Sequence, residues 1–303
     1  MNEKNNETQQ VNVSAIKAIN KQDFKQKVKA YMKRPTSFIL LILVLLAAGI
    51  TVGVLGILVG YILINGVPHL KPSLFAWTYN SDNVSMMPAI INTLIMTGIS
   101  LLISVPFGMG TAIYLVEYAK KGNKLVEIIR VTAETLSGIP SIIYGLFGML
   151  FFVTTLGWGY SVLAGASTLA IMVLPVIMRT TEEALLAVPD SYREGSFGLG
   201  AGRLRTIFCI ILPAAVPGIL SGVILAIGRI VGETAALIYT AGTVANVSSS
   251  LFASGRTLSV HMYTLSREGL HTDEAYATAV VLLLIVMGIN WFSGCLAKRI
   301  SRG

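Results

Sequence analysis

Two ionisable residues, Arg229 and Glu233, lie inside the apolar stretch of residues 224–239, which reads ILAIGRIVGETAALIY. A guanidinium offers forked N–H donors that match the oxygens of carboxylate and phosphate groups. Residues four apart share one face of a helix, so the glutamate could instead neutralise the arginine as internal glue. Because ionisable groups in mid-membrane usually mark a substrate path, the pattern favours a path for an anion over a purely structural pair.

A second charged pair, Arg179 and Glu182, lies at the inner end of the apolar stretch 160–178. Residues three apart also share a helix face. Two such pairs in one chain strengthen the interpretation that charged side chains line a path.

A break is expected in the apolar stretch 132–157, where Gly138 and Pro140 interrupt the sequence beside Ser137 and Ser141. Proline frees a backbone carbonyl, and lipid-exposed backbone does not tolerate a free carbonyl. We therefore expect this break to face protein or water near the path. A kink with a purely architectural role is the alternative, since Pro and Gly are common in membrane helices.

The elements that must position these residues are membrane helices. Apolar residues make up 54% of the 303-residue chain and charged residues 13%, a composition typical of membrane proteins. Stretches of about 20 apolar residues can cross a hydrocarbon core about 30 Å thick. Six are expected, at residues 38–64, 89–116, 132–157, 160–178, 213–241 and 277–297.

Lysine and arginine fall on one side of these stretches, which predicts that both termini are cytoplasmic and that the protein crosses a plasma membrane several times. Residues 1–35 are expected to form a basic cytoplasmic tail, and residues 36–303 a transmembrane domain. The net charge of +8 is explained by this topology, so no nucleic-acid partner is expected.

Several chemistries have no motif in this chain. A phosphate-binding loop of the form G-x-x-x-x-G-K-[ST] is missing from the sequence, so ATP is not expected to bind here. The three histidines, His69, His261 and His271, are scattered in stretches predicted to be solvated outside loops, so no metal site is expected. No catalytic residue is expected either.

A connection at residues 179–212 is too polar to span the membrane and carries a spaced motif. It reads Glu194-Gly195-Ser196, then Gly200, then Ile210, then Leu212-Pro213. This pattern resembles the EAA...G.........I.LP signature of ABC importer permeases, with Gly195 and Ser196 replacing two alanines. The resemblance implies an all-α bundle of six helices of the type I permease kind, with a short cytoplasmic coupling helix that fits into a separate ATPase subunit.

A narrower resemblance rests on three stretches: SGIPSIIYGLFG at 137–148, RTTEEAL at 179–185 and GRIVGETAALIYTAG at 228–242. Together they are similar to the phosphate importer permeases of the PstA type, from about residue 36 to the C-terminus. The resemblance implies a prokaryotic cell membrane, a second related permease of the PstC type, two ATPase copies of the PstB type that hold ATP and Mg, and an extracytoplasmic phosphate-binding protein of the PstS type.

Within that resemblance, Glu233 can serve selectivity. Hydrogen phosphate keeps a proton at neutral pH and sulfate does not, so a carboxylate could accept that hydrogen bond from phosphate and oppose sulfate. The alternatives are an ABC permease for another oxyanion, such as molybdate or sulfate, and a proton-coupled secondary anion carrier. A structural scaffold would leave the intramembrane charges unexplained.

Overall fold

The computed structural model describes residues 35–120 and 122–300, and every regular element within these ranges is helical. The predicted basic tail, residues 1–35, lies almost wholly outside the described residues. The chain divides after Tyr61 into two compact units. The first unit contributes most of α2 (Pro35–Gly66), which is apolar along its whole length, with a mean hydropathy of 3.0 over its best window.

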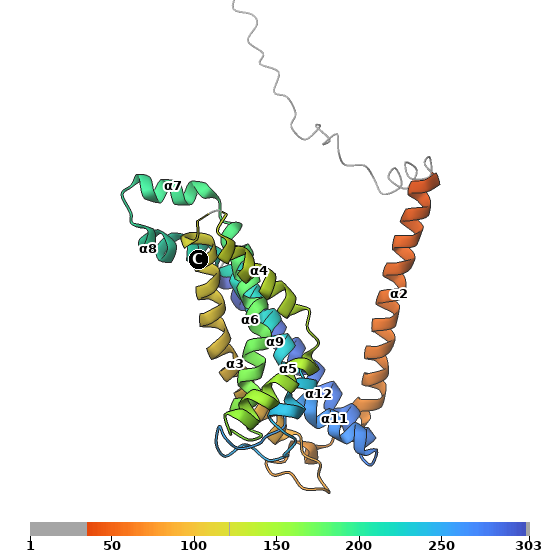
Figure 1. The fold of residues 1–303 in the computed structure, drawn as a ribbon. Helices are drawn as coiled ribbons and strands as arrows, with labels where there is room; N and C mark the ends of the chain where they lie inside the picture. The colour runs from red at the N-terminus through yellow and green to blue at the C-terminus, as the bar shows by residue number, and fades with distance from the viewer. Residues whose placement is uncertain (1–34, 121, 301–303) are drawn as a thin grey trace, which may run out of the picture. The chain divides into compact units, whose positions relative to one another are not determined.

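The second unit is a helical bundle with short helices at both ends (Figure 1). Its long helices are α3 (Met87–Ile113), α6 (Val162–Leu186), α9 (Leu212–Gly232) and α12 (Thr272–Ile300). The shorter pair α7 (Asp190–Gly198) and α8 (Arg203–Thr206) lies at one end of the bundle, and α11 (Leu258–Glu268) lies at the other.

Five helices of the described chain are long and apolar enough to cross a membrane, and a bent pair makes a sixth span. The bent pair joins α4 (Lys124–Ser137) to α5 (Ser141–Gly148) and its π-helical extension Met149–Thr155, at an angle of 102°. The predicted break in the third stretch is therefore confirmed, and the break lies at the predicted residues.

The fifth span differs from the prediction of residues 213–241. It runs from Arg203 to Gly232, through the π-helical turn Ile207–Ile211 and α9. The chain then breaks at Glu233 and continues as the short helix α10 (Ala235–Thr240). Hydropathy alone could not place these ends, because the apolar sequence continues through the break and the polar start of the span is helical.

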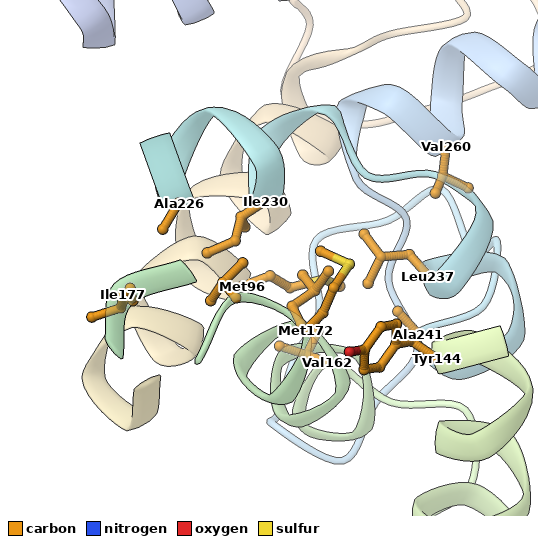
Figure 2. Packing of buried hydrophobic residues seen from close by; sticks show 12 residues of the cluster. Met96, Tyr144, Val162, Met172, Ile177, Ala226, Ile230, Leu237, Ala241 and Val260 are labelled. Carbon is orange, nitrogen blue, oxygen red and sulfur yellow. The ribbon is translucent and has the colours of Figure 1, made fainter. Parts of the chain in front are cut away.

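The centre of the bundle is an apolar core between α3, α5, α6, α9 and α10. Met96, Met172 and Leu237 are fully buried there, and Tyr144 is nearly so. Figure 2 shows the Tyr144 ring among the side chains of this core. Because α5 and α10 both enter this core, the two broken segments of the chain meet inside the bundle.

Glycines allow the closest helix contacts. A side chain at Gly218 or Gly222 of α9 would meet Ala184 or Thr180 of α6, so this pair of small residues four apart allows close packing. Gly228 and Gly232, a second such pair, have no atom near the position that a Cβ would take. Half of the small-residue face of α9 is therefore packed inside this chain.

Gly145 of α5 offers a test of the meeting point between the broken segments. A Cβ at Gly145 would lie 2.8 Å from the Cα of Ala236, so backbone would have to move. We expect Gly145→Ala to destabilise the protein by about 1–3 kcal/mol through overpacking. The measurement is the thermal unfolding midpoint of the purified protein in detergent.

Gly98→Ala in α3 is the matched control, because no atom lies within 4 Å of its added Cβ. That variant should be neutral or slightly stabilising, since alanine is the better helix former. Equal unfolding midpoints for the two variants would contradict the close packing of α5 on α10.

Candidate functional site

A pocket of about 500 Å³ opens between α4, α6 and α9. Its lining combines apolar residues with several ionisable or hydroxyl side chains, namely Arg130, Glu134, Ser137, Arg179, Glu182 and Glu183. The structure thus brings together three of the residues predicted for the path and its neighbourhood: Arg179, Glu182 and Ser137. It also brings in the arginine and glutamate of α4, which sequence analysis did not select.

Arg130 and Glu182 form the most buried ion pair of this pocket. The Nε of Arg130 donates to Oε1 of Glu182 at 2.7 Å, and Nη2 of the same guanidinium pairs with the same oxygen. The Glu182 side chain is 10% exposed and that of Arg130 is 49% exposed. The pair joins α4 to α6, so it links the broken span to the central helix of the bundle.

Arg179 has a different partner from the predicted one. Its Nε donates to Oε1 of Glu183 at 3.2 Å, along the exposed side of α6. Glu182 points to Arg130 instead, so Arg179 and Glu182 do not form the expected pair. The spacing rule identified a shared face, but a partner on a neighbouring helix took the buried carboxylate.

Arg130 was missed because the third span was expected to begin at residue 132. The helix in fact begins at Lys124, and Glu127, Arg130 and Glu134 recur along it at spacings of three and four. Residues at these spacings share a helix face. This charged stripe on an otherwise apolar helix is the signal that could have identified the pocket lining.

The helix break places its free backbone groups against protein. Gly138 ends α4 and Pro140 begins α5. Pro140 has no N–H to give to the carbonyl of Leu136, four residues earlier. The Leu136 carbonyl accepts the Ile139 N–H at 3.1 Å and the hydroxyl of the buried Tyr144 at 2.7 Å, so it is satisfied without the helical donor that Pro140 lacks. Ser137 hydrogen bonds within its own helix, to the carbonyl of Glu134.

Arg229 and Glu233 do not share a helix face, which corrects the expectation from their spacing. The helix ends at Gly232, and Glu233 has extended backbone angles. The Glu233 carboxylate accepts a hydrogen bond from the Ala236 N–H at 3.1 Å and so caps α10, while the Glu233 backbone carbonyl accepts one from Ser259. Glu233 is 9% exposed.

Arg229 is half-buried in the last turn of α9. Within residues 35–120 and 122–300, the structure gives its guanidinium no carboxylate partner and no side-chain hydrogen bond. It lies close enough to the Tyr144 hydroxyl to act on it electrostatically. A membrane arginine without an internal counter-ion is therefore located beside the helix break.

The predicted coupling connection is more helical than expected. Arg179 to Leu186 belong to α6, and Ile210, Leu212 and Pro213 belong to the fifth span, so only about residues 187–202 project from the bundle. Pro189 caps α7, and Gly200 has a φ of +82°, which favours glycine.

The outer surface of α7 is exposed and carries Glu194 and Gly195 together with aromatic side chains, Tyr192 and Phe197. Ser196 faces inward and shares a 2.7 Å hydrogen bond with Thr206 of α8. The short helix expected in this connection is confirmed in its location, and it leaves two aromatic side chains exposed.

His261 corrects the expectation of solvated histidines. It belongs to α11 and is fully buried, beside the ring of Tyr79. Burial, together with the positive charge of the nearby Arg256, lowers the pKa of His261 to about 3. The imidazole is therefore neutral at physiological pH. Arg256 is buried as well, and its guanidinium lies over the Tyr79 ring.

Comparison with known proteins decides the family. The model of the binding-protein-dependent transport system inner membrane component matches residues 104–303. The chain belongs to this family of ABC importer permeases. The match covers the broken span, the pocket, α7 and the fifth and sixth spans, and a permease of this family works with an ATPase and a substrate-binding protein.

Curated relatives agree with this assignment. The permease is 36% identical over 279 residues to the probable ABC transporter permease protein YqgI of Bacillus subtilis, which covers 84% of this chain and 94% of that one. It is 33% identical to the phosphate transport system permease protein PstA of Haemophilus influenzae, covering 75% and 82% of the two chains. With PstA 1 of Mycobacterium tuberculosis it shares 36% identity over 67% of each chain.

Solved structures support the fold. A bacterial alginate ABC transporter in complex with a pentasaccharide-bound periplasmic protein aligns with a TM-score of 0.64 at 16% identity, covering 92% of this permease and 99% of that chain. The methionine ABC transporter MetNI aligns at 0.55 and 19%, covering 71% and 94%. The predicted fold class, a polytopic helical bundle of the type I importer kind, is confirmed.

Two adjacent glutamates of the pocket, Glu182 and Glu183, allow the buried ion pair to be tested against an exposed one. Glu182→Gln removes the charge that faces Arg130 but keeps a hydrogen-bond acceptor. We expect a loss of about 1–2 kcal/mol, less than for a fully buried pair because solvent screens the half-exposed arginine. Glu183→Gln, on the exposed side, should change stability by less than about 0.5 kcal/mol.

The measurement is the unfolding midpoint of each detergent-solubilised variant. Equal midpoints for Glu182→Gln and Glu183→Gln would contradict a stabilising role for the buried pair of Arg130 and Glu182.

Proposed function

We propose that this permease forms half of the translocation path of an ATP-driven importer of inorganic phosphate. The observation that carries the proposal is Arg229, which lies in a membrane helix without a carboxylate partner among the described residues. An intramembrane cation is expensive unless something compensates it. A passing oxyanion supplies that compensation, and the PstA relatives make phosphate the anion of choice.

The position of Arg229 suits a path residue. The adjacent break at Gly138 to Pro140 gives an irregular backbone, which membrane proteins place where it faces protein or a water-filled cavity. Two or more of the five N–H groups of Arg229 can bind phosphate oxygens in a forked arrangement that a lysine cannot reproduce. Glu233, beyond the end of the same helix, contributes a negative charge to the region.

The pocket between α4, α6 and α9 is a second site at which the same anion can bind. Arg130 and Arg179 line it, and each is held by a glutamate, Glu182 and Glu183 respectively. A carboxylate that neutralises an arginine in the empty pocket prevents a bare charge there. Phosphate, with more oxygens and more charge, can displace the more exposed of the two carboxylates, Glu183, and be released when that carboxylate returns.

The remaining partners follow from the same proposal. A second permease of the PstC type completes the path, two ATPase subunits of the PstB type hold ATP and Mg, and a PstS-type protein delivers phosphate. The exposed face of α7 docks on the ATPase. The distribution of lysine and arginine supports a topology with both termini and α7 in the cytoplasm and the binding protein on the opposite side.

Arg229→Gln tests the path directly. We expect ATP-dependent phosphate uptake by vesicles that hold the whole complex to fall by at least about tenfold, because the forked cation is lost from the path. Arg229→Lys should retain part of the activity, since it keeps the charge without the fork. Lys71→Gln, an exposed substitution in the loop after α2, should transport normally.

Subunit content is measured in parallel. Full uptake in an assembled Arg229→Gln complex would make this arginine structural, and failure to assemble would mean that it pairs with the partner permease. If the wild-type complex does not take up phosphate but takes up molybdate or sulfate, that anion would replace phosphate as the proposed substrate.

Glu233→Gln tests selectivity. The amide oxygen can still accept the Ala236 N–H, so the cap of α10 is kept and only the charge is lost. We expect sulfate to inhibit phosphate uptake at concentrations about tenfold lower than in the wild type, because the repulsion that opposes it is gone. Glu268→Gln, exposed at the end of α11, is the control. Unchanged sulfate inhibition would limit Glu233 to its capping role.

A further inference from the structure

Arg193 of α7 turns inward while its neighbours in the sequence face outward. Its side chain is 16% exposed, and its ion-pair partner Glu117 is 8% exposed. Tyr192, the residue before it, is 51% exposed. The coupling helix therefore holds one buried charge, and that charge points toward the bundle and away from the surface where another protein would dock.

All five N–H groups of the Arg193 guanidinium have an acceptor. Nε and Nη2 both donate to Oε1 of Glu117, at 3.1 and 2.7 Å. The second hydrogen of Nη2 reaches the Leu185 carbonyl at 3.0 Å. Nη1 donates to the Val188 carbonyl at 3.0 Å and to Oδ1 of Asp190 at 3.2 Å.

These acceptors belong to different elements. Glu117 lies in the π-helical turn Tyr114–Tyr118 that continues α3, Leu185 lies in the last turn of α6, and Asp190 begins α7. The carbonyls at a helix C-terminus have no partner within the helix, and a cation satisfies them well. One side chain thus joins α7 to α6 and to α3, although α3 is not adjacent to α7 in the sequence.

A second contact reinforces the connection to α3. The guanidinium carbon of Arg203, in α8, lies 5.6 Å from the centre of the Tyr118 ring. Glu117 and Tyr118 are consecutive residues, so the end of α3 contacts both helices of the projecting segment. Beneath them, Leu115, Leu185 and Ile211 pack in one buried apolar cluster, which makes the ends of α3, α6 and the fifth span a single rigid base.

We propose that Arg193 is the positioning residue through which movement of the coupling helix reaches α3. The proposal rests on the proposed function, in which the ATPase binds α7. Sequence adjacency alone would transmit a displacement of α7 only to α6 and to the fifth span. The Arg193–Glu117 pair adds α3, so three spans move together with α7 when the ATPase subunits close.

Geometry makes this role specific to arginine. A planar guanidinium can donate to a carboxylate on one side and to two carbonyls on the other. A lysine has three donors on a single nitrogen, so it cannot reach all the acceptors that surround the edges of the Arg193 guanidinium. Breaking a buried pair also leaves an uncompensated charge, so variants of either partner should loosen the attachment strongly.

The experiment uses the assembled complex in lipid nanodiscs, with spin labels at Leu199 beyond α7 and at Ala119 beyond the α3 extension. Electron–electron distance measurements are made without nucleotide and with ATP trapped by vanadate. In the wild type the distance between the labels should stay the same in both states, because α7 and α3 move as one body. A wild-type distance that changes with nucleotide would overturn the proposal.

Glu117→Gln and Arg193→Lys are compared with Asp190→Asn, which removes only the exposed negative charge beside the same guanidinium. The first two variants should broaden the distance distribution and lower the phosphate transported per ATP hydrolysed about fivefold or more, with subunit content unchanged. Asp190→Asn should match the wild type. An unchanged distribution and transport ratio in both test variants would also overturn the proposal.

The distance measurement separates this proposal from the proposed function. It reports whether α7 and α3 move together whatever the cargo is. A wild-type complex with a constant distance but no phosphate uptake would contradict the phosphate assignment and leave the role of Arg193 supported.

Discussion

The structure depends on one constraint, which is that every charge and every freed backbone group within the membrane needs a partner inside the protein. The Leu136 carbonyl, to which Pro140 has no N–H to donate, accepts a hydrogen bond from the Tyr144 hydroxyl. Glu182 accepts one from Arg130 of a neighbouring helix. Each pairing fixes one segment against another. Among the described residues Arg229 has no carboxylate partner, and this is the basis for proposing that it meets a substrate.

The break at Gly138 to Pro140 and the break at Glu233 also give polar groups partners inside the protein. α5 packs on α10 through Gly145, so the irregular backbone of both segments is brought into one apolar core. An unbroken helix at either place would carry the segment that follows it, α5 or α10, away from this core. The breaks are therefore a means of placing polar groups inside the bundle without exposing backbone to lipid.

Near the C-terminal end of α6, the Arg193–Glu117 pair connects helices, whereas the pairs of Arg130 and Arg179 line the pocket. Arg193 is fully hydrogen bonded and nearly buried, whereas Arg179 and Arg130 are half or more exposed to their pocket. The difference in burial separates two tasks. The exposed pairs suit the proposed path, because solvated pairs are weak and easily opened by an anion, whereas the enclosed Arg193 pair suits the proposed mechanical connection.

The sequence by itself determined the membrane class, the approximate spans, the break near Pro140, the short helix after Pro189 and the family, because hydropathy, proline and a spaced motif are local signals. Only the tertiary structure decided the pairing of charges. Glu182 pairs with Arg130 and not with Arg179, and Glu233 caps α10. Arg193 pairs with Glu117, 76 residues away in the sequence. Spacing along a helix limits which residues share a face, but packing between helices decides which partner a buried charge finds, and that information is not local.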